Sequence, residues 1–241
     1  MLSADSVARA VAPFGLNSIG VTSVASYDAE VGPERRLAQW LDGAESIIVA
    51  GNGGGAFWGA YGRWCAADAT RAGRSDPLDD FTREVVEAAC APLADPETMR
   101  ILYPFGVEGV SFTRLAILAG LGRPSLVGVL VHPIYGPWMA LRAAILVRGR
   151  LEAPRPADGF DPCPTCRERS CITACPAGAV GPAGWNMPRC AAHRARPDDP
   201  CATRCHARVA CVLGPEHRYP DDALAYHQRR AREPLLRVGG R

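Results

Sequence analysis

Residues 161–180 have the sequence DPCPTCRERSCITACPAGAV, and they decide how the rest of the chain is interpreted. Two residues separate Cys163 from Cys166, four separate Cys166 from Cys171, and three separate Cys171 from Cys175, which Pro176 follows. In a reducing compartment, cysteines clustered in this way more often bind metal or carry out redox chemistry than form disulfides. The stretch therefore predicts a metal centre.

The spacing matches a known cluster-binding run with one departure. Bacterial ferredoxins use C-x2-C-x2-C-x3-C-P, in which the fourth cysteine binds the other of two clusters. Here the middle gap is two residues longer, and a second set of four cysteines follows. Ferredoxin logic predicts two [4Fe–4S] clusters, one held by Cys163, Cys166, Cys171 and Cys211, and the other by Cys175, Cys190, Cys201 and Cys205. This assignment uses all eight cysteines without remainder.

Three other interpretations of the eight cysteines stay open. Zinc also takes four thiolates, although zinc sites usually keep local CxxC pairs, and this set has only one. Four disulfides would require an oxidising compartment. A single cluster is the third alternative. The remaining cysteines, Cys65 and Cys90, are isolated and are expected to be buried, inert thiols.

The overall composition narrows the class of protein. All 27 basic residues among the 241 are arginine, so lysine-based chemistry is excluded. Hydrophobic residues make up 48% and charged residues 22%, which excludes gross disorder. The net charge of +2 does not indicate nucleic-acid or membrane-surface binding. The first 15 residues lack a signal-peptide core, and no apolar run is long enough to span a bilayer. We therefore expect a cytoplasmic protein without a membrane segment.

The pattern of apolar residues predicts two domains. A Pro-rich segment, Leu151–Asp161, separates an α/β domain over residues 1–150 from a cysteine domain with a C-terminal tail over residues 151–241. Alternating helices and strands are expected in the first domain. Helices are predicted at Ser3–Ala12, Pro33–Leu41, Phe57–Ala69, Leu78–Leu93 and Phe112–Leu121, and strands at Ser18–Val24, Ser46–Ala50, Met99–Tyr103, Ser125–Val131 and Ala143–Val147.

A glycine-rich segment follows the strand Ser46–Ala50 and precedes a helix. A tight structural turn is the default interpretation of such a segment, and the functional alternative is that it holds an anion or admits a flat cofactor against the backbone. Aromatic residues follow, and they predict either a stacking face or a core stripe. The candidate cofactor-binding residues here are Gly51, Gly53, Gly54, Gly55, Phe57 and Trp58.

Four side chains are candidates for proton transfer or substrate contact. They are Tyr103, Glu108, His132 and Tyr135. They can act together only if the fold brings them into one pocket. His132 lies at a predicted strand end, where a hydrogen-bonded structural histidine is the alternative.

The cysteine pattern, with four, then one, then three, resembles the C-terminal domain of epoxyqueuosine reductases and cobalamin-dependent reductive dehalogenases. Residues 119–147 (AGLGRPSLVGVLVHPIYGPWMALRAAILV) are similar to the stretch before the clusters in epoxyqueuosine reductase. The resemblance implies a nitroreductase-like α/β domain that holds cobalamin next to one cluster, followed by a small ferredoxin-like domain. It adds Tyr135 and Trp138 to the candidate cofactor contacts. It also places Glu108 near the position of the family's catalytic aspartate.

These observations favour an iron–sulfur oxidoreductase. Two [4Fe–4S] clusters would pass electrons to cobalamin or a substrate in the first domain. The alternative is a ferredoxin-like electron carrier without its own catalysis. The expected partners are a low-potential donor of the flavodoxin or ferredoxin type and a small-molecule substrate or corrinoid. Nucleic acid and membrane are not expected.

Overall fold

The computed structural model describes residues 2–95, 97–107, 109–152 and 159–239. The chain divides into two compact units. Unit 1 contains Met1–Gly122 and Ala140–Asp158, and unit 2 contains Arg123–Met139 and Gly159–Arg241. The chain therefore passes from unit 1 to unit 2, returns to unit 1, and then enters unit 2 again.

Unit 1 is a mixed α/β unit. Its helices are α1 (Ala4–Val11), α2 (Val24–Asp28), α3 (Ala56–Ala67), α4 (Pro77–Cys90) and α5 (Phe112–Leu118). Its strands are β1 (Ser18–Ser23), β2 (Ala44–Gly53), β3 (Met99–Leu102) and β6 (Met139–Arg148), of which Met139 belongs to unit 2. Short 3-10 turns occur at Ala12–Phe14, Pro33–Arg35, Leu37–Gln39 and Arg71–Gly73.

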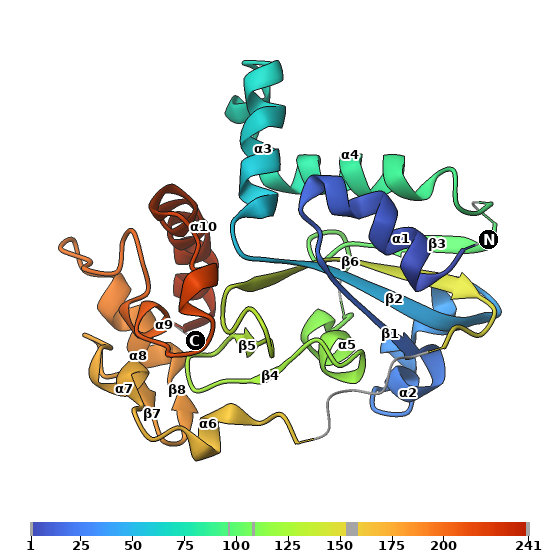
Figure 1. Ribbon diagram of the computed structural model, residues 1–241. Helices are drawn as coiled ribbons and strands as arrows, with labels where there is room; N and C mark the ends of the chain where they lie inside the picture. Colours follow the sequence, from blue (N-terminus) through green and yellow to red (C-terminus); the bar gives the residue numbers. More distant parts are fainter. Residues whose placement is uncertain (1, 96, 108, 153–158, 240–241) are drawn as a thin grey trace. The chain divides into compact units, whose positions relative to one another are not determined.

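The strands of unit 1 form one four-stranded sheet in the order β1-β2-β6-β3. β1 is antiparallel to β2, with Ser18 opposite Gly51, and β3 is antiparallel to β6, with Met99 opposite Val147. The central strands β2 and β6 are continuous apolar runs, and the side chains of residues 47–50 and 143–146 are fully buried. Such runs are typical of strands covered on both faces. Figure 1 shows α1 and α4 on one side of this sheet and α5 on the other.

One predicted helix of unit 1 is replaced by two turns. The helix expected over residues 33–41 is broken at Arg36, whose ψ of 142° is extended. The backbone N–H of Leu37 instead donates to the Asp28 carboxylate at 2.8 Å, and the Leu37 side chain is fully buried. The hydrogen bond to Asp28 and the burial of Leu37 therefore outweigh the local sequence preference for a continuous helix.

Unit 2 is built from small elements around the cysteines. They are the hairpin β4 (Arg123–Pro124) and β5 (Leu130–Val131), the hairpin β7 (Val180–Gly181) and β8 (Gly184–Trp185), helices α6 (Pro162–Thr165), α7 (Ser170–Thr173), α8 (Met187–Arg194), α9 (His206–Val209) and α10 (Asp221–Gly239), and a 3-10 turn at Pro215–His217. No helix in the described ranges is both long and apolar enough to cross a membrane.

This division differs from the domain boundary predicted at residue 150. Residues 123–139 precede that boundary in sequence but belong to unit 2. Gly136 and Gly214 explain why, because each sits against backbone of the other segment. A Cβ at Gly136 would lie 2.2 Å from the Leu213 carbonyl oxygen, and one at Gly214 would lie 2.7 Å from the Tyr135 carbonyl carbon. Both glycines also have positive φ. The close backbone contact and the left-handed turn therefore each require glycine at these positions.

The first prediction concerns the contact between β2 and β6. A Cβ on Gly51 would lie 2.7 Å from the Ala140 carbonyl oxygen, so Gly51→Ala must push two central strands apart. We expect it to lower the free energy of unfolding by about 1–3 kcal/mol. Gly62, inside α3, has nothing within 4 Å of the position that a Cβ would take, so Gly62→Ala is the matched control. The control should raise stability by up to about 1 kcal/mol in urea unfolding. Equal effects of the two variants would contradict the close contact.

Candidate metal centre

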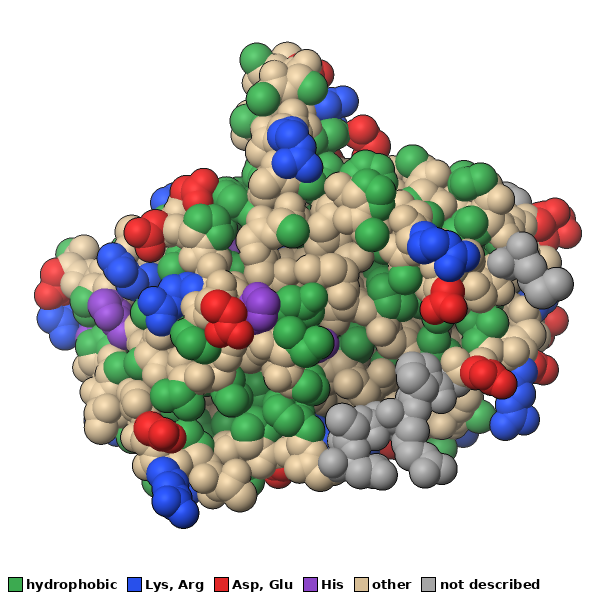
Figure 2. Space-filling model, in the orientation of Figure 1, with side chains coloured by type: hydrophobic (Ala, Val, Ile, Leu, Met, Phe, Trp, Pro, Cys, Tyr) green, Lys and Arg blue, Asp and Glu red, His purple; other side chains and the backbone are tan. Residues whose placement is uncertain are grey.

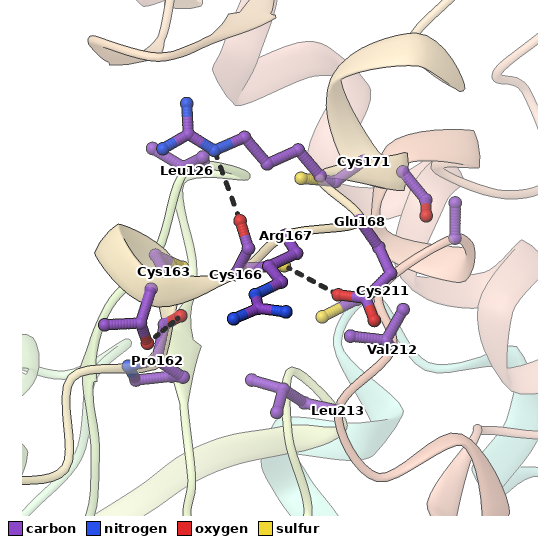
Figure 3. Close-up of a pocket in the computed structure, with 14 residues that line it drawn as sticks. Leu126, Pro162, Cys163, Cys166, Arg167, Glu168, Cys171, Cys211, Val212 and Leu213 are labelled. Atoms are coloured by element: carbon purple, nitrogen blue, oxygen red, sulfur yellow. Dashed lines mark hydrogen bonds between the residues drawn. The ribbon is translucent and has the colours of Figure 1, made fainter.

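Four of the predicted cysteines line one cavity in unit 2. The cavity has a volume of about 350 Å³, and Cys163, Cys166, Cys171 and Cys211 all contribute to its wall. Three come from α6, α7 and the loop between them, and Cys211 follows α9. Figure 3 shows these cysteines around the same space, with Val212 and Leu213 beside them. Residues 40 positions apart in sequence thus contribute sulfur to one site.

The electrostatics of these thiols show the same grouping. Burial raises the pKa of Cys171, and the nearby sulfurs of Cys211, Cys163 and Cys166 raise it further. Burial likewise raises the pKa of Cys211, with additional repulsion from Cys163 and Cys166. The Cys166 thiol donates to the Glu168 carboxylate at 3.7 Å. Each thiol therefore makes its neighbours harder to ionise, which a bound cation would reverse.

The other four cysteines form a second group. Burial raises the pKa of Cys190, and Cys205 and Cys175 add to this effect. Burial also raises the pKa of Cys201 to about 11, with contributions from Cys205, Asp199 and Cys190. α8 carries Cys190, and Cys205 immediately precedes α9. Cys175, Cys190, Cys201 and Cys205 therefore influence one another electrostatically, and their role as a second ligand set stays a prediction.

A buried ion pair supports the loop of the second group. Arg194, 3% exposed, contacts the Asp199 carboxylate at 3.3 Å and donates to the Gln228 carbonyl oxygen of α10 at 2.8 Å. Asp199 accepts the N–H of Cys201 at 2.8 Å, and the Gln228 amide donates to the Cys201 carbonyl oxygen at 3.1 Å. These supporting residues were not predicted from the sequence. The only indication in the sequence is that Arg194 and Asp199 lie between Cys190 and Cys201.

His193 lies in the same region. A ring nitrogen of His193, a carboxylate oxygen of Asp199 and the Cys201 sulfur lie within 4.8 Å of one another. The His193 Nε2 atom is buried and has no hydrogen-bond partner within the described part of the chain. A histidine so placed can donate to a cluster sulfur, which is one way in which surrounding residues tune a metal site.

The donor set fits iron–sulfur clusters. A zinc site needs four sulfurs about 2.3 Å from a single ion. The first group surrounds a cavity of about 350 Å³, which is large enough to admit a cluster. All ten cysteines are free thiols in the structure. Two groups of four thiols suit two [4Fe–4S] clusters, each of which takes four thiolates.

His132 and Tyr135 are brought together, but the chemistry of His132 differs from the prediction. They lie in one tight turn of unit 2, with ring centroids 4.8 Å apart, and Tyr135 also meets His217 edge-on at 4.9 Å. The His132 Nδ1 atom accepts the N–H groups of Ile134 at 3.0 Å and Tyr135 at 3.3 Å. Burial lowers the pKa of His132 to about 4, and His217 lowers it further. The ring is therefore neutral, with its proton on Nε2, and it is a poor proton donor near pH 7.

The second prediction tests this histidine. Its pKa in the folded protein, about 4, lies below the ordinary value of 6.5, so protonation favours the unfolded chain. The stabilisation is complete above pH 6.5 and is lost as the pH falls from 6.5 to about 4. We expect His132→Asn to keep the turn, because an Asn oxygen can accept the same N–H groups, and to reduce this acid sensitivity. Urea unfolding at several pH values measures it. A His132 imidazole NMR signal that titrates near pH 6.5 would contradict the lowered pKa of His132.

Of the other two proton-transfer candidates, the structure describes only Tyr103. Tyr103 lies in unit 1, is 5% exposed, and donates to Glu87 at 3.4 Å. Burial, followed by the charge of Glu87, raises the pKa of Tyr103 well above its usual range. A tyrosine in that state is a structural hydrogen-bond donor rather than a proton donor. Glu108 lies outside the described residues.

The glycine-rich segment is mostly enclosed by the fold, which favours the structural interpretation. Gly51 packs on the backbone of β6, and Gly53 exchanges two hydrogen bonds with the Asn17 side chain at 2.7 and 3.0 Å. Phe57 is 1% exposed beneath Arg142. Gly54 is also buried, whereas Gly55 is exposed and Trp58 is half-buried. Gly51, Gly53 and Gly54 are thus enclosed by other parts of the protein, and their role in cofactor binding stays a prediction.

A cavity of unit 1 lies elsewhere, between α1 and β1. Its volume is about 900 Å³, and Asp5, Asn17 and Leu151 are among the residues that line it. None of the predicted cofactor-binding residues does. Trp138 belongs to unit 2 and is fully buried, with Arg208 above its ring at 5.0 Å and Tyr219 edge-on at 5.8 Å. Its position is that of a core residue rather than of a cofactor contact.

Comparison with known proteins gives similarity of fold. The chain matches no protein-family model and no curated protein sequence. Epoxyqueuosine reductase from Bacillus subtilis matches with a TM-score of 0.58 and 17% identity over 90% of this chain and 66% of that chain. Another structure of an epoxyqueuosine reductase contains a tRNA-Tyr stem loop. This chain thus spans about two thirds of the length of these reductases.

Two further folds are similar. The B12-trafficking protein CblC of C. elegans matches with a TM-score of 0.57 and 16% identity, over 98% of this chain and 96% of that chain. The catabolic reductive dehalogenase NpRdhA, in complex with 3-bromo-4-hydroxybenzoic acid, gives a TM-score of 0.52 and 16% identity, over 94% of this chain and 34% of that chain. The suspected resemblance to this group of proteins is confirmed at the level of fold.

Proposed function

We propose that this chain is an iron–sulfur reductase whose unit 2 binds two [4Fe–4S] clusters in a ferredoxin-like arrangement. The observation that carries the proposal is the cavity lined by Cys163, Cys166, Cys171 and Cys211, because three local thiols and one distant thiol meet there. The second group, Cys175, Cys190, Cys201 and Cys205, would hold the other cluster. A reducing compartment such as the cytoplasm suits ten free thiols.

Each part of unit 2 has a role in this proposal. Bound clusters would supply single-electron chemistry at low potential. The eight cysteines would bind iron as thiolates, and the positive charge of the iron would offset the repulsion between them. Leu126, Val212 and Leu213 line the first cavity and limit water at the sulfurs. Arg194 and Gln228 hold the loop that carries Cys201. Electrons would leave for a small-molecule acceptor.

The test is a metal and sulfide analysis of protein purified without oxygen. We expect about eight iron and eight inorganic sulfide per chain, and a broad absorbance near ~400 nm that dithionite bleaches. Electron paramagnetic resonance of the reduced protein should show two interacting paramagnets. Colourless protein with stoichiometric zinc would overturn the proposal.

A second candidate function is the handling of a corrinoid, as reductant or as carrier. The end-to-end match with the B12-trafficking protein CblC favours it, since the two chains are similar over almost their full lengths. The enclosed glycines of unit 1 argue against the site predicted from sequence, so no step is assigned to a corrinoid here. Titration with cob(II)alamin, followed by its visible spectrum, distinguishes the two candidates. Unchanged corrinoid bands together with reducible clusters leave a reductase or an electron carrier.

A further inference from the structure

The extra residues in the cysteine run form an exposed turn at the mouth of the first cavity. Arg167, Glu168 and Arg169 are all exposed, and all three line the cavity. Arg169 is the only residue other than glycine with positive φ, 42°, in the described part of the chain. Its Nε atom donates back to the Cys166 carbonyl oxygen at 3.3 Å. An arginine in this conformation is strained, and strain kept at a site is a reason to look for a function.

Apolar side chains lie beside this turn. Leu126, Val212 and Leu213 line the same cavity, and Val212 is 46% exposed. Val129 and Ile134 of unit 2 are 37% and 61% exposed. Figure 2 shows hydrophobic side chains gathered, with few charges among them, over the region where Figure 1 places β4 and β5. Exposed apolar surface of this kind typically marks an interaction site.

Charge is distributed unevenly between the two units. Unit 2 contains 14 arginines and eight acidic residues, whereas unit 1 contains 13 arginines and 17 acidic residues. Although the net charge of the whole chain is close to zero, unit 2 is therefore basic. A basic surface attracts an acidic partner over distance and accelerates their encounter.

We propose that the Arg167–Arg169 turn and its apolar neighbours, Leu126, Val212 and Leu213, form the docking surface for an acidic electron-donor protein of the flavodoxin or ferredoxin class. This inference rests on the proposed cluster between Cys163, Cys166, Cys171 and Cys211. One electron leaves the donor's reduced flavin or cluster and enters the acceptor cluster, and no bond forms or breaks. Transient redox complexes use small interfaces. The mixture of apolar groups and Glu168 with the arginines favours a protein over the uniformly anionic backbone of RNA.

The test is the rate at which a photoreduced bacterial flavodoxin reduces the protein in its cluster-loaded form. Arg167→Glu should lower the second-order rate constant about tenfold at low salt and weaken its dependence on ionic strength. Arg229→Glu changes the charge of unit 2 equally at an exposed position on α10, and it should stay within about twofold of the unchanged protein. Arg169→Gly keeps the positive φ without the charge. It should raise the midpoint of urea unfolding while slowing reduction by flavodoxin.

Two further measurements separate the possible failures. Photoexcited deazaflavin, a small reductant, should reduce all variants at the same rate. If it reduces none of them, and no cluster signal appears, then the proposed function fails rather than the docking surface. Equal slowing by Arg167→Glu and Arg229→Glu would overturn the docking surface. A second result would also overturn it. If the Arg167→Glu variant reacts normally with flavodoxin but no longer binds a tRNA stem loop in fluorescence anisotropy, the turn is an RNA interface.

Discussion

Replacing Cys211 with serine is expected to remove one cluster and leave the other. Cys211 lines the first cavity, and the electrostatic neighbours that affect its pKa are Cys163 and Cys166. Iron should fall from about eight to about four per chain, with a matching loss of absorbance near ~400 nm. Cys205→Ser should cause the same fractional loss from the second group. The paramagnetic signal that remains should therefore differ between the two variants.

The matched control for these variants is Cys65→Ser. Cys65 lies on α3 in unit 1 and belongs to neither group of cysteines, so its replacement should leave the iron content unchanged. The pairing would be wrong if Cys211→Ser and Cys205→Ser gave identical remaining signals. It would also be wrong if Cys211→Ser retained all of its iron.

Arg194→Ala should be among the most destabilising single substitutions in unit 2. The side chains of the Arg194–Asp199 pair are 4% and 6% exposed, so removal of the guanidinium leaves a buried carboxylate without its cation. It also removes the donor to the Gln228 carbonyl oxygen. The expected loss is about 3–5 kcal/mol in the free energy of unfolding. Because the same pair holds the Cys201 loop, iron should be lost from the second group first.

Arg196→Ala provides the comparison two positions away. Arg196 pairs with Asp198 at 2.7 Å, but these side chains are 54% and 69% exposed. An exposed pair contributes about 0–1 kcal/mol, because water and salt screen it. Urea unfolding of both variants measures the difference. Similar losses from the two substitutions would show that the Arg194–Asp199 pair does not act as a buried one.

Local patterns were sufficient for much of unit 1. The apolar runs around Ile48 and Ile145 are strands, as predicted, because burial on both faces leaves a continuous hydrophobic signal. Spacing also predicts the grouping of the cysteines, and Cys163, Cys166, Cys171 and Cys211 line one cavity. Both features depend on residues that lie close together in sequence or on a known ligand geometry.

Contacts between distant residues could not be predicted in this way. Asn17 is 36 residues from Gly53, yet its side chain satisfies the backbone groups that were expected to face a cofactor. Residues 123–139 lie before the proposed linker, and only their contacts with Leu213 and Gly214 assign them to unit 2. The N–H group of Ile134 that donates to His132 Nδ1 is likewise placed by the backbone geometry of the turn, which the spacing of residues in the sequence does not predict.

The close fit of Gly136 and Gly214 has a consequence for biosynthesis. Gly136 leaves the ribosome well before Leu213 and Gly214, against which its backbone must rest. The segment 123–139 therefore remains without its partner until residues 213 and 214 have been synthesised, whereas the sheet of unit 1 is already complete at Arg148. Folding should thus occur in two stages, with the sheet of unit 1 formed first and the segment 123–139 captured only afterwards.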